Sequence, residues 1–210
     1  MIKVAYSDVS RLNLKKAYPL LSSMRKEKVS RFRFDKDKKL SCGAYILLRR
    51  LLEEENITNP IFKKTKYEKP YISNYPDTYF NLSHSGKYVV CAVSDSPVGV
   101  DIEYNDPDID LNIARYYFFN TEYENIIHSD NPSNEFFKYW VLKESYMKYT
   151  GLGFHLNLNS FEIIIEESIR LKGDKDNIKF NLFDLEDYKL AVASTNTVNR
   201  CIEFTVESLY

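Results

Sequence analysis

Disulfide pairs, phosphate-binding glycine loops and long apolar runs are all missing from this sequence. Its three cysteines, Cys42, Cys91 and Cys201, form no CxxC pair, which argues against a disulfide framework and a structural zinc site. No apolar run approaches the roughly 18 to 20 residues that span a bilayer, and the start of the chain lacks the basic region and apolar stretch of a signal peptide. We therefore expect a soluble, cytoplasmic protein that binds no membrane and keeps its cysteines as core thiols.

Glycine and proline are also scarce, with 6 and 7 copies among 210 residues. This composition, in which 44% of residues are hydrophobic and 15% are aromatic, excludes collagen, coiled coil and disorder. A compact chain of this length buries roughly 70% of its unfolded surface and forms one domain or two small ones. The sequence therefore predicts a globular protein with a substantial core.

The net charge of -1 conceals two oppositely charged halves. Residues 1–75 carry 18 basic and 8 acidic side chains, whereas the remainder carries 11 basic and 22 acidic ones. Much of the basic surplus lies in one segment, with Arg25, Lys26, Lys28, Arg31, Arg33, Lys36, Lys38 and Lys39. This segment could bind a small phosphate-bearing ligand or be a solvated helix face with internal ion pairs. Nucleic acid is not expected as a partner, because the acidic half would repel a long phosphate backbone.

Hydrophobic spacing predicts an α+β chain. The expected helices cover residues 41–54 and 136–150, the second ending at Gly151. The expected strands are, in order, 2–6, 79–83, 88–94, 98–104, 161–165, 178–182, 190–194 and 204–206. A hairpin turn is expected at Gly173-Asp174.

Two of these strands are similar at an offset of one hundred residues, since 88–94 (YVVCAVS) stands against 188–194 (YKLAVAS). Each copy follows a helix. So short a match also arises by chance between two buried strands, but the repeated order favours two similar α+β subdomains. A ligand cleft is expected at the seam between them.

Three clusters of polar residues carry the candidate chemistry. In the strand 98–104, Asp101 and Glu103 share a face about 6.5 to 7 Å apart, which fits a hard divalent cation or an ordinary solvent-facing strand. Gly99, on the same face, would let a ligand approach the backbone.

The second cluster lies on the long helix, where Phe136, Trp140, Glu144 and Lys148 form one stripe. Glu144 and Lys148 could be a simple helix ion pair. Their place on the stripe with the only Trp instead indicates a cleft, where the carboxylate needs a partner such as a metal.

The third cluster is the turn Asn81-Leu82-Ser83-His84-Ser85-Gly86, whose hydroxyl and imidazole could meet a phosphate. The residues fit no nucleophile elbow.

Four motifs, taken together, resemble the Sfp-type 4'-phosphopantetheinyl transferases in order and spacing. They are Tyr67-Glu68-Lys69-Pro70, the turn 81–86, Gly99-Val100-Asp101-Ile102-Glu103, and Trp140 to Lys148 (WVLKESYMK). The resemblance implies a monomer with pseudo-twofold symmetry, subdomains at 1–100 and 101–210, and coenzyme A bound in the seam. The chain departs from the family at Glu68, where a glycine is usual, and at Leu40, where an arginine is expected.

The resemblance also implies roles for particular residues. Asp101, Glu103 and Glu144 would hold Mg²⁺ against the pyrophosphate of coenzyme A, bordered by Lys143 and Lys148. The remaining contacts to coenzyme A would come from Ser83 and His84 at its phosphates, Lys69 and Pro70 near the adenine, Arg25 and Lys28 near the 3'-phosphate, and Lys39 and Ser41 on the first long helix.

The implied reaction moves the phosphopantetheine arm to a serine of an acyl, peptidyl or polyketide carrier protein. Lys148 would stabilise the charge on the pyrophosphate, and Glu144, directly or through a metal-bound water, would take the serine proton. The aromatic segment 116–119 with Tyr123 is a candidate docking surface or a piece of core. A metal-dependent phosphodiesterase or nuclease, and a non-catalytic nucleotide-binding module, are the alternatives.

Overall fold

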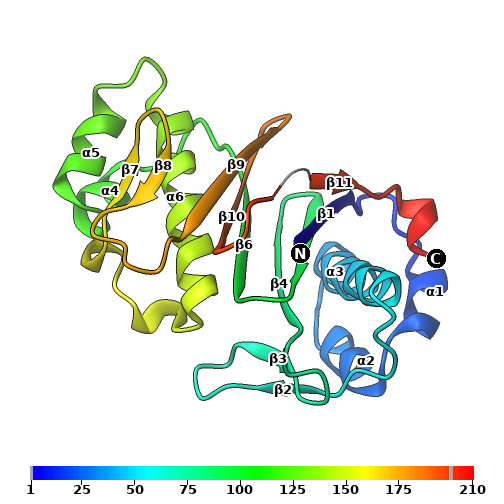
Figure 1. Ribbon diagram of the computed structural model, residues 1–210. Helices are drawn as coiled ribbons and strands as arrows, with labels where there is room; N and C mark the ends of the chain where they lie inside the picture. The colour runs from blue at the N-terminus through cyan, green and yellow to red at the C-terminus, as the bar shows by residue number, and fades with distance from the viewer. Residues whose placement is uncertain (1, 199–200) are drawn as a thin grey trace.

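The computed structural model, which describes residues 2–198 and 201–210, consists of two lobes that repeat one order of elements (Figure 1). The first lobe contains strand β1 (Ile2–Asp8), helix α3 (Asp35–Glu54) and strands β4 (Tyr79–Ser85) and β5 (Tyr88–Ser94). The second contains, in the same order, β6 (Val98–Tyr104), α6 (Pro132–Thr150), β9 (Lys179–Leu185) and β10 (Tyr188–Ser194).

The strand registers show that the repeat extends to individual residue pairs. In the first hairpin Tyr79 pairs with Ser94, and in the second Lys179 pairs with Ser194, one hundred residues later. β1 lies antiparallel to β5, as β6 lies antiparallel to β10. The α+β fold with two pseudo-twofold-related halves is therefore confirmed. β6 pairs with β10 along its whole length and so belongs to the second lobe. The expected boundary between the two subdomains, at residue 100, therefore lies inside this strand.

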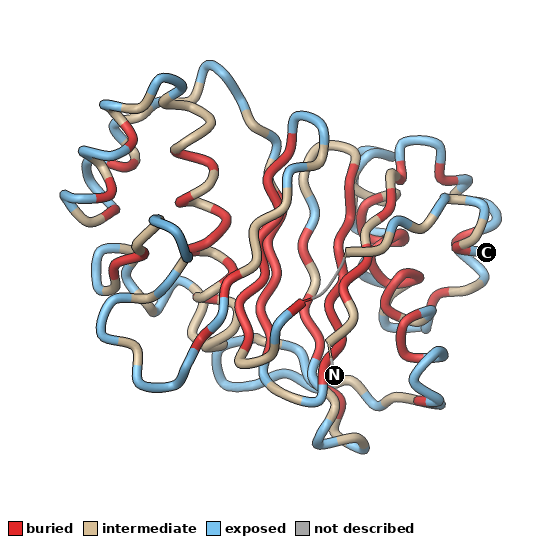
Figure 2. The backbone as a smooth tube through the Cα atoms, turned by 45° about the horizontal axis from the view of Figure 1, so that its top comes forward, coloured by how far each residue is buried: buried red, intermediate tan, exposed pale blue. Residues whose placement is uncertain are grey.

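The molecule is layered as helix, sheet, sheet and helix. Alternate residues of β5 point to opposite sides, as strand geometry requires. Val89, Cys91 and Val93 pack under α3, whereas Val90 and Ala92 face the seam, where they join the β10 residues Leu190 and Val192. Figure 2 shows the buried strands together in the middle of the molecule with the helices outside. The two larger sheets have the strand orders β11-β1-β5-β4, where β11 is Cys201–Glu203, and β6-β10-β9.

Smaller elements complete each lobe. In the first lobe these are α1 (Leu14–Ala17), α2 (Ser23–Ser30), β2 (Phe62–Lys64), β3 (Pro70–Ile72) and the C-terminal strand β11 (Cys201–Glu203), which pairs with β1. In the second they are α4 (Asn112–Tyr117), α5 (Asn120–Ile127), β7 (Ile163–Ile165) and β8 (Ile169–Leu171). Short 3-10 helices lie at Tyr18–Leu20, Gly153–His155, Leu158–Ser160 and Val206–Leu209.

Most predicted elements are present, and the differences have local causes. α3 begins six residues before the predicted start, with Asp35 and Asp37 in its first turn, where acidic side chains favour a helix. The expected strand 204–206 is wrong, because β11 ends at Glu203 and a 3-10 helix begins at Val206.

The turn at Gly173-Asp174 joins no hairpin. β8 pairs with β7, and β9 pairs with β10. The Asp174 carboxylate instead accepts the main-chain N–H groups of Asp176 and Ile178 and so organises a loop between β8 and β9.

The three cysteines are free, as expected, with Cys42 and Cys91 buried. Within the described ranges no helix is both long enough and apolar enough to cross a membrane.

Candidate active site at the seam of the two lobes

Side chains, not a continuous strand ladder, join β4 of the first lobe to β6 of the second. The amide oxygen of Asn81 accepts the N–H of Val100 at 2.9 Å, and the Ser85 hydroxyl accepts the N–H of Tyr104 at 3.1 Å. Between them the Ser83 hydroxyl donates to Asp101 Oδ1 at 2.7 Å. Because side chains take up the space between the strands, the two lobes stand slightly apart here and leave room for a cleft.

The cleft has a volume of about 340 Å³ and is formed by both lobes. It brings together all three polar clusters predicted from the sequence. Its lining residues are Leu82, Ser83, His84, Asp101, Glu103, Trp140, Glu144, Lys148 and Phe154.

Asp101 is the most deeply buried polar residue of the cleft, with 1% of its surface exposed. Its Oδ1 accepts hydrogen bonds from the Ser83 hydroxyl and from Lys148 Nζ, the latter at 2.5 Å, and the same amine donates to Ser83. Its other carboxylate oxygen, Oδ2, is buried and has no hydrogen-bond partner among the residues that the structure describes. A buried anionic oxygen without a donor is costly, so this atom favours a cationic ligand.

The pKa values of Glu103 and Glu144 are both raised, and the negative charge of Asp101 contributes to each. Burial, followed by the nearby charge of Asp101, raises the pKa of Glu103 to about 7. The same two causes, in the same order, raise the pKa of Glu144. Across the described part of the chain, however, no three acidic, histidine or cysteine side chains are arranged as a finished metal site. The Lys148 amine, placed against Asp101, supplies the positive charge at this point.

Gly99 lets helix α6 come close to β6. A Cβ atom at this position would lie 2.0 Å from the carbonyl oxygen of Ser145 and 2.3 Å from the main-chain nitrogen of Tyr149. The expectation that Gly99 makes room for a ligand is therefore wrong, since the helix itself occupies that space. The close approach brings Glu144 and Lys148 of α6 over the acids of β6.

The predicted stripe on α6 is present. Phe136 is buried and stacks on Trp140, with ring centroids 5.6 Å apart. Trp140, Glu144 and Lys148 then line the cleft. Aromatic packing thus fixes the side of α6 that faces the cleft.

Arg25, Lys28 and Lys64 form a basic cluster in the first lobe, near the cleft. Arg25 of α2 lies over the Tyr45 ring at 5.1 Å and contacts the Ser41 hydroxyl at 3.5 Å. Burial, and then the charges of Arg25 and Lys64, lower the pKa of Lys28. Burial, and then the charges of Lys148 and Lys28, lower the pKa of His84. His84 therefore stands between this cluster and the cleft, and adjacent cations of this kind favour an anionic ligand.

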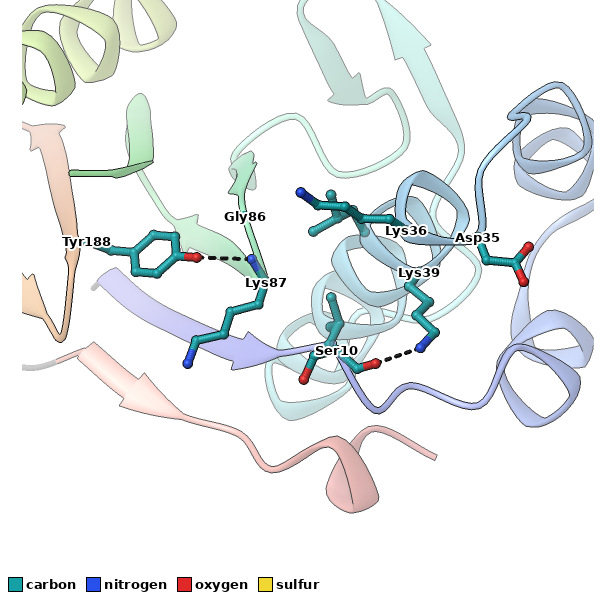
Figure 3. Close-up of a pocket in the computed structure, with 9 residues that line it drawn as sticks. Ser10, Asp35, Lys36, Lys39, Gly86, Lys87 and Tyr188 are labelled. Carbon is teal, nitrogen blue, oxygen red and sulfur yellow. Dashed lines mark hydrogen bonds between the residues drawn. The ribbon is translucent and has the colours of Figure 1, made fainter. Parts of the chain in front are cut away.

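Lys39 does not join Ser41, although the two are close in sequence. Positions two apart point to different sides of a helix. Lys39 Nζ donates to the carbonyl oxygen of Ser10 at 2.5 Å, beside a separate cavity of about 470 Å³ (Figure 3). The Tyr188 hydroxyl at this second cavity accepts the main-chain N–H of Lys87. Lys39 and Ser41, both expected to contact coenzyme A, therefore have different surroundings, and only Ser41 lies against Arg25.

Lys143 does not reach the cleft either. Its side chain is fully buried in the second lobe, where Nζ contacts Glu122 at 2.8 Å and donates to the carbonyl oxygens of Leu158 and Phe161 at 2.9 and 2.8 Å. The expectation that Lys143 borders a pyrophosphate is corrected, because the adjacent positions 143 and 144 point to different sides of α6.

The Lys69 side chain also differs from expectation. Its amine donates to carbonyl oxygens at the end of α6, at Lys148 (2.5 Å) and Tyr149 (3.0 Å), so it does not point out toward an adenine. Pro70 is exposed at the start of β3. Glu68 has φ of 66°, a left-handed conformation that glycine adopts more easily. This backbone angle accounts for the glycine that is usual in the resembled family.

Sequence reasoning missed Phe154 at the rim of the cleft, with 80% of its surface exposed. The sequence feature that could have indicated this position is an aromatic residue directly after the glycine-rich turn Gly151-Leu152-Gly153.

Fold and cleft together define a class of protein: a duplicated α+β enzyme whose lobes enclose carboxylates and a lysine beside a basic cluster. Such a cleft suits a reaction at a phosphate.

Comparison with known proteins identifies the family. The model described as 4'-phosphopantetheinyl transferase superfamily matches residues 97–193, and the one described as 4'-phosphopantetheinyl transferase, N-terminal, matches residues 8–96. A Bacillus subtilis 4'-phosphopantetheinyl transferase is 34% identical over 84% of this chain and 83% of its own. The 4'-phosphopantetheinyl transferase Sfp of B. subtilis strain 168 is 31% identical over the same shares. The 4'-phosphopantetheinyl transferase gsp of Aneurinibacillus migulanus is 40% identical over 58% of this chain and 52% of its own.

The chain belongs to the 4'-phosphopantetheinyl transferase superfamily, and its activity is that of a 4'-phosphopantetheinyl transferase. The hydrolase and binding-module alternatives are thereby set aside.

Proposed function

We propose that this protein transfers the 4'-phosphopantetheine arm of coenzyme A to a serine hydroxyl of an acyl, peptidyl or polyketide carrier protein and releases 3',5'-ADP. The main support is that one cleft joins Ser83, Asp101, Glu103, Glu144 and Lys148. A ligand with phosphates at two separate points fits the cleft together with the neighbouring basic cluster.

The phosphates and the adenine of coenzyme A each have suitable partners. Arg25, Lys28 and Ser41 would receive the 3'-phosphate, because they place two cations and a hydroxyl close together. His84 lies between that group and the cleft, where Ser83 and Lys148 would contact the diphosphate. Pro70, exposed at the start of β3, would lie beside the adenine.

The acids of the cleft fit Mg²⁺. Hard cations take oxygen ligands, and Mg²⁺ is usually held by one or two carboxylates together with substrate phosphates. Asp101 offers a buried oxygen that has no partner, and Glu103 and Glu144 line the same cavity. These three residues would hold the ion, which when bound would neutralise charge on the diphosphate.

The chain's own groups supply the remaining chemistry. The serine oxygen forms a bond to the phosphorus that carries the pantetheine arm, while the bond from that phosphorus to the oxygen of 3',5'-ADP breaks. Glu144, which lines the same cleft, would take the serine proton as the general base. Lys148, whose amine lies against Asp101 and Ser83 in the cleft, would stabilise the leaving diphosphate oxygen.

An assay by intact mass tests this function. Incubation of the protein with coenzyme A, Mg²⁺ and an apo carrier protein should add the mass of the phosphopantetheine arm to the carrier. Chelation of divalent ions with EDTA should stop the transfer, and excess Mg²⁺ should restore it. A carrier that keeps its original mass across acyl, peptidyl and polyketide types would contradict the proposal, and undiminished transfer after exhaustive chelation would contradict the metal site alone.

The carrier protein must cover the rim of the cleft, because its serine has to reach the phosphorus. Phe154 lies at this rim and is highly exposed, and exposed aromatic side chains often anchor partners. The predicted docking segment 116–119 divides in two, since Tyr116 and Tyr117 are 70% and 58% exposed whereas Phe118 stacks on Phe136 in the core. We propose Phe154 as the principal carrier contact.

Phe154→Ser should raise the KM for the carrier protein by about 10-fold, the effect of losing one aromatic anchor. The KM for coenzyme A should change much less, because none of the contacts proposed for its phosphates comes from Phe154. Tyr104→Ser, which removes an exposed aromatic residue outside the rim, is the control. An unchanged carrier KM in the Phe154 variant would exclude docking at this point.

We place the reaction in the cytoplasm and expect a monomer. The buried thiols of Cys42 and Cys91 are unpaired, as in a reducing compartment. Both walls of the cleft come from one chain, so a second copy is not needed to complete it.

A further inference from the structure

We propose that Lys69 is a positioning residue, which ties the β2–β3 hairpin of the first lobe to the C-terminal end of α6 and thereby fixes Glu144 and Lys148 in the cleft. The inference deepens the proposed function, since it concerns the placement of the same two side chains. Its structural part can be tested without any enzymatic activity.

The amine of Lys69 satisfies three main-chain carbonyl groups of the second lobe. It donates to Lys148 at 2.5 Å, to Tyr149 at 3.0 Å and to Val98 at 3.3 Å. The last carbonyls of a helix have no partner within the helix, and this end carries negative partial charge. A cation is therefore favoured here, and it joins the end of α6 to the start of β6.

Gly151 makes room for the lysine. This residue ends α6 in the left-handed conformation, with φ of 74°. A Cβ atom added to it would lie 2.9 Å from Cδ of Lys69. The glycine therefore meets two requirements at once, the turn of the chain and the passage of the lysine side chain. Such a close fit indicates a fixed path for Lys69 across the end of the helix.

The turn that carries Lys69 is itself ordered. The Thr65 hydroxyl accepts the N–H groups of Tyr67 and Lys69, and the main-chain N–H of Thr65 donates to the Lys69 carbonyl at 2.9 Å. The Tyr67 ring also contacts the ring of His155, with centroids 5.0 Å apart, in the segment that follows α6. The hairpin therefore holds the second lobe at two points.

The same hairpin also reaches the basic cluster. Lys64 of β2 lies close enough to Lys28 to lower its pKa, after burial and the charge of Arg25. One short hairpin thus lies between the cluster proposed for the 3'-phosphate and the helix end that carries Lys148. Because reacting groups must be placed to within a fraction of an ångström, loss of this tie should affect chemistry more than binding.

The test compares Lys69→Met with Lys63→Met, which removes an exposed lysine from the same hairpin. We expect Lys69→Met to lower kcat about 10- to 100-fold, as small misplacements of catalytic groups do, with the KM for coenzyme A within about twofold of the native value. Amide hydrogen exchange in residues 146–150 should become faster in this variant only. Lys69→Gln, a shorter neutral donor, should show an intermediate effect and serves if the methionine variant does not fold.

Unchanged exchange at the end of α6 would overturn the tie, whether or not the protein transfers phosphopantetheine. Faster exchange with native kcat would show that the tie is structural and would overturn the positioning role. An increase in the KM for coenzyme A at native kcat would make Lys69 a ligand contact. Absence of transfer by the wild-type protein would count against the proposed function and leave the exchange result valid.

Discussion

Glu144→Gln should lower the rate of phosphopantetheine transfer by about 10²- to 10⁴-fold, the usual contribution of a general base. The substitution keeps the size of the side chain and its place on α6 but removes the carboxylate that we propose takes the serine proton. It also removes a negative charge beside Asp101, the second cause of the raised pKa of Glu144. The fold should therefore be retained, since a crowded carboxylate is replaced by a neutral amide.

Single-turnover rates and circular dichroism of the variant would check both parts of this expectation. Glu135→Gln is the matched control, because Glu135 lies on the same helix but pairs with Lys138 away from the cleft. Near-native turnover of Glu144→Gln would refute its role as the base. Equal losses in the two variants would indicate a general effect on α6 and would equally contradict a specific role.

Much of the fold could be predicted because local sequence and tertiary packing agree there. The strand 88–94 has its predicted ends, and both it and its counterpart one hundred residues later are buried throughout. A strand buried on both faces has a continuous apolar sequence, which is visible without an alignment. The stripe on α6 was visible for the same reason, since apolar spacing at helical period predicts which side faces inward.

Three predicted lysine contacts failed for a different reason. Motif resemblance places residues along the chain but gives no direction to a long side chain, which can span several ångströms either way. Lys39 bonds to a loop carbonyl, Lys69 to the end of α6, and Lys143 to a glutamate in the core. All three lysines donate to main-chain carbonyl groups, which every residue possesses and which leave no signal in the sequence.

The arrangement of the acids in the cleft could be predicted only in part. The sequence placed Asp101 and Glu103 on one strand face and Glu144 on a helix stripe, and all three line one cavity. It could not show that Lys148 and Ser83 share one oxygen of Asp101 while the other has no partner. This division of one carboxylate follows from the approach of α6 to Gly99, a contact between the backbones of two elements more than forty residues apart.

Lys143→Met should be the most destabilising of these substitutions, reducing the free energy of unfolding by about 3 to 5 kcal/mol, because it leaves a buried charge without its partner. Glu122 is 1% exposed and also accepts the N–H groups of Ile163 and Phe119. Burial lowers the pKa of Lys143 and raises that of Glu122. The pair therefore depends on mutual contact and on hydrogen bonds. Methionine removes the contact and the hydrogen bonds of the Lys143 amine, and it leaves the Glu122 carboxylate with its two main-chain donors but without a cation.

Urea unfolding of three variants would measure the effect. Lys138→Met, which breaks a more exposed pair on the same helix, should cost no more than about 1 kcal/mol. The double variant Lys143→Met/Glu122→Gln should recover part of the loss, since it leaves no unpaired charge in the core. If Lys143→Met instead kept native stability and raised the KM for coenzyme A, this lysine would lie at the diphosphate after all, and the buried pair would have to be abandoned.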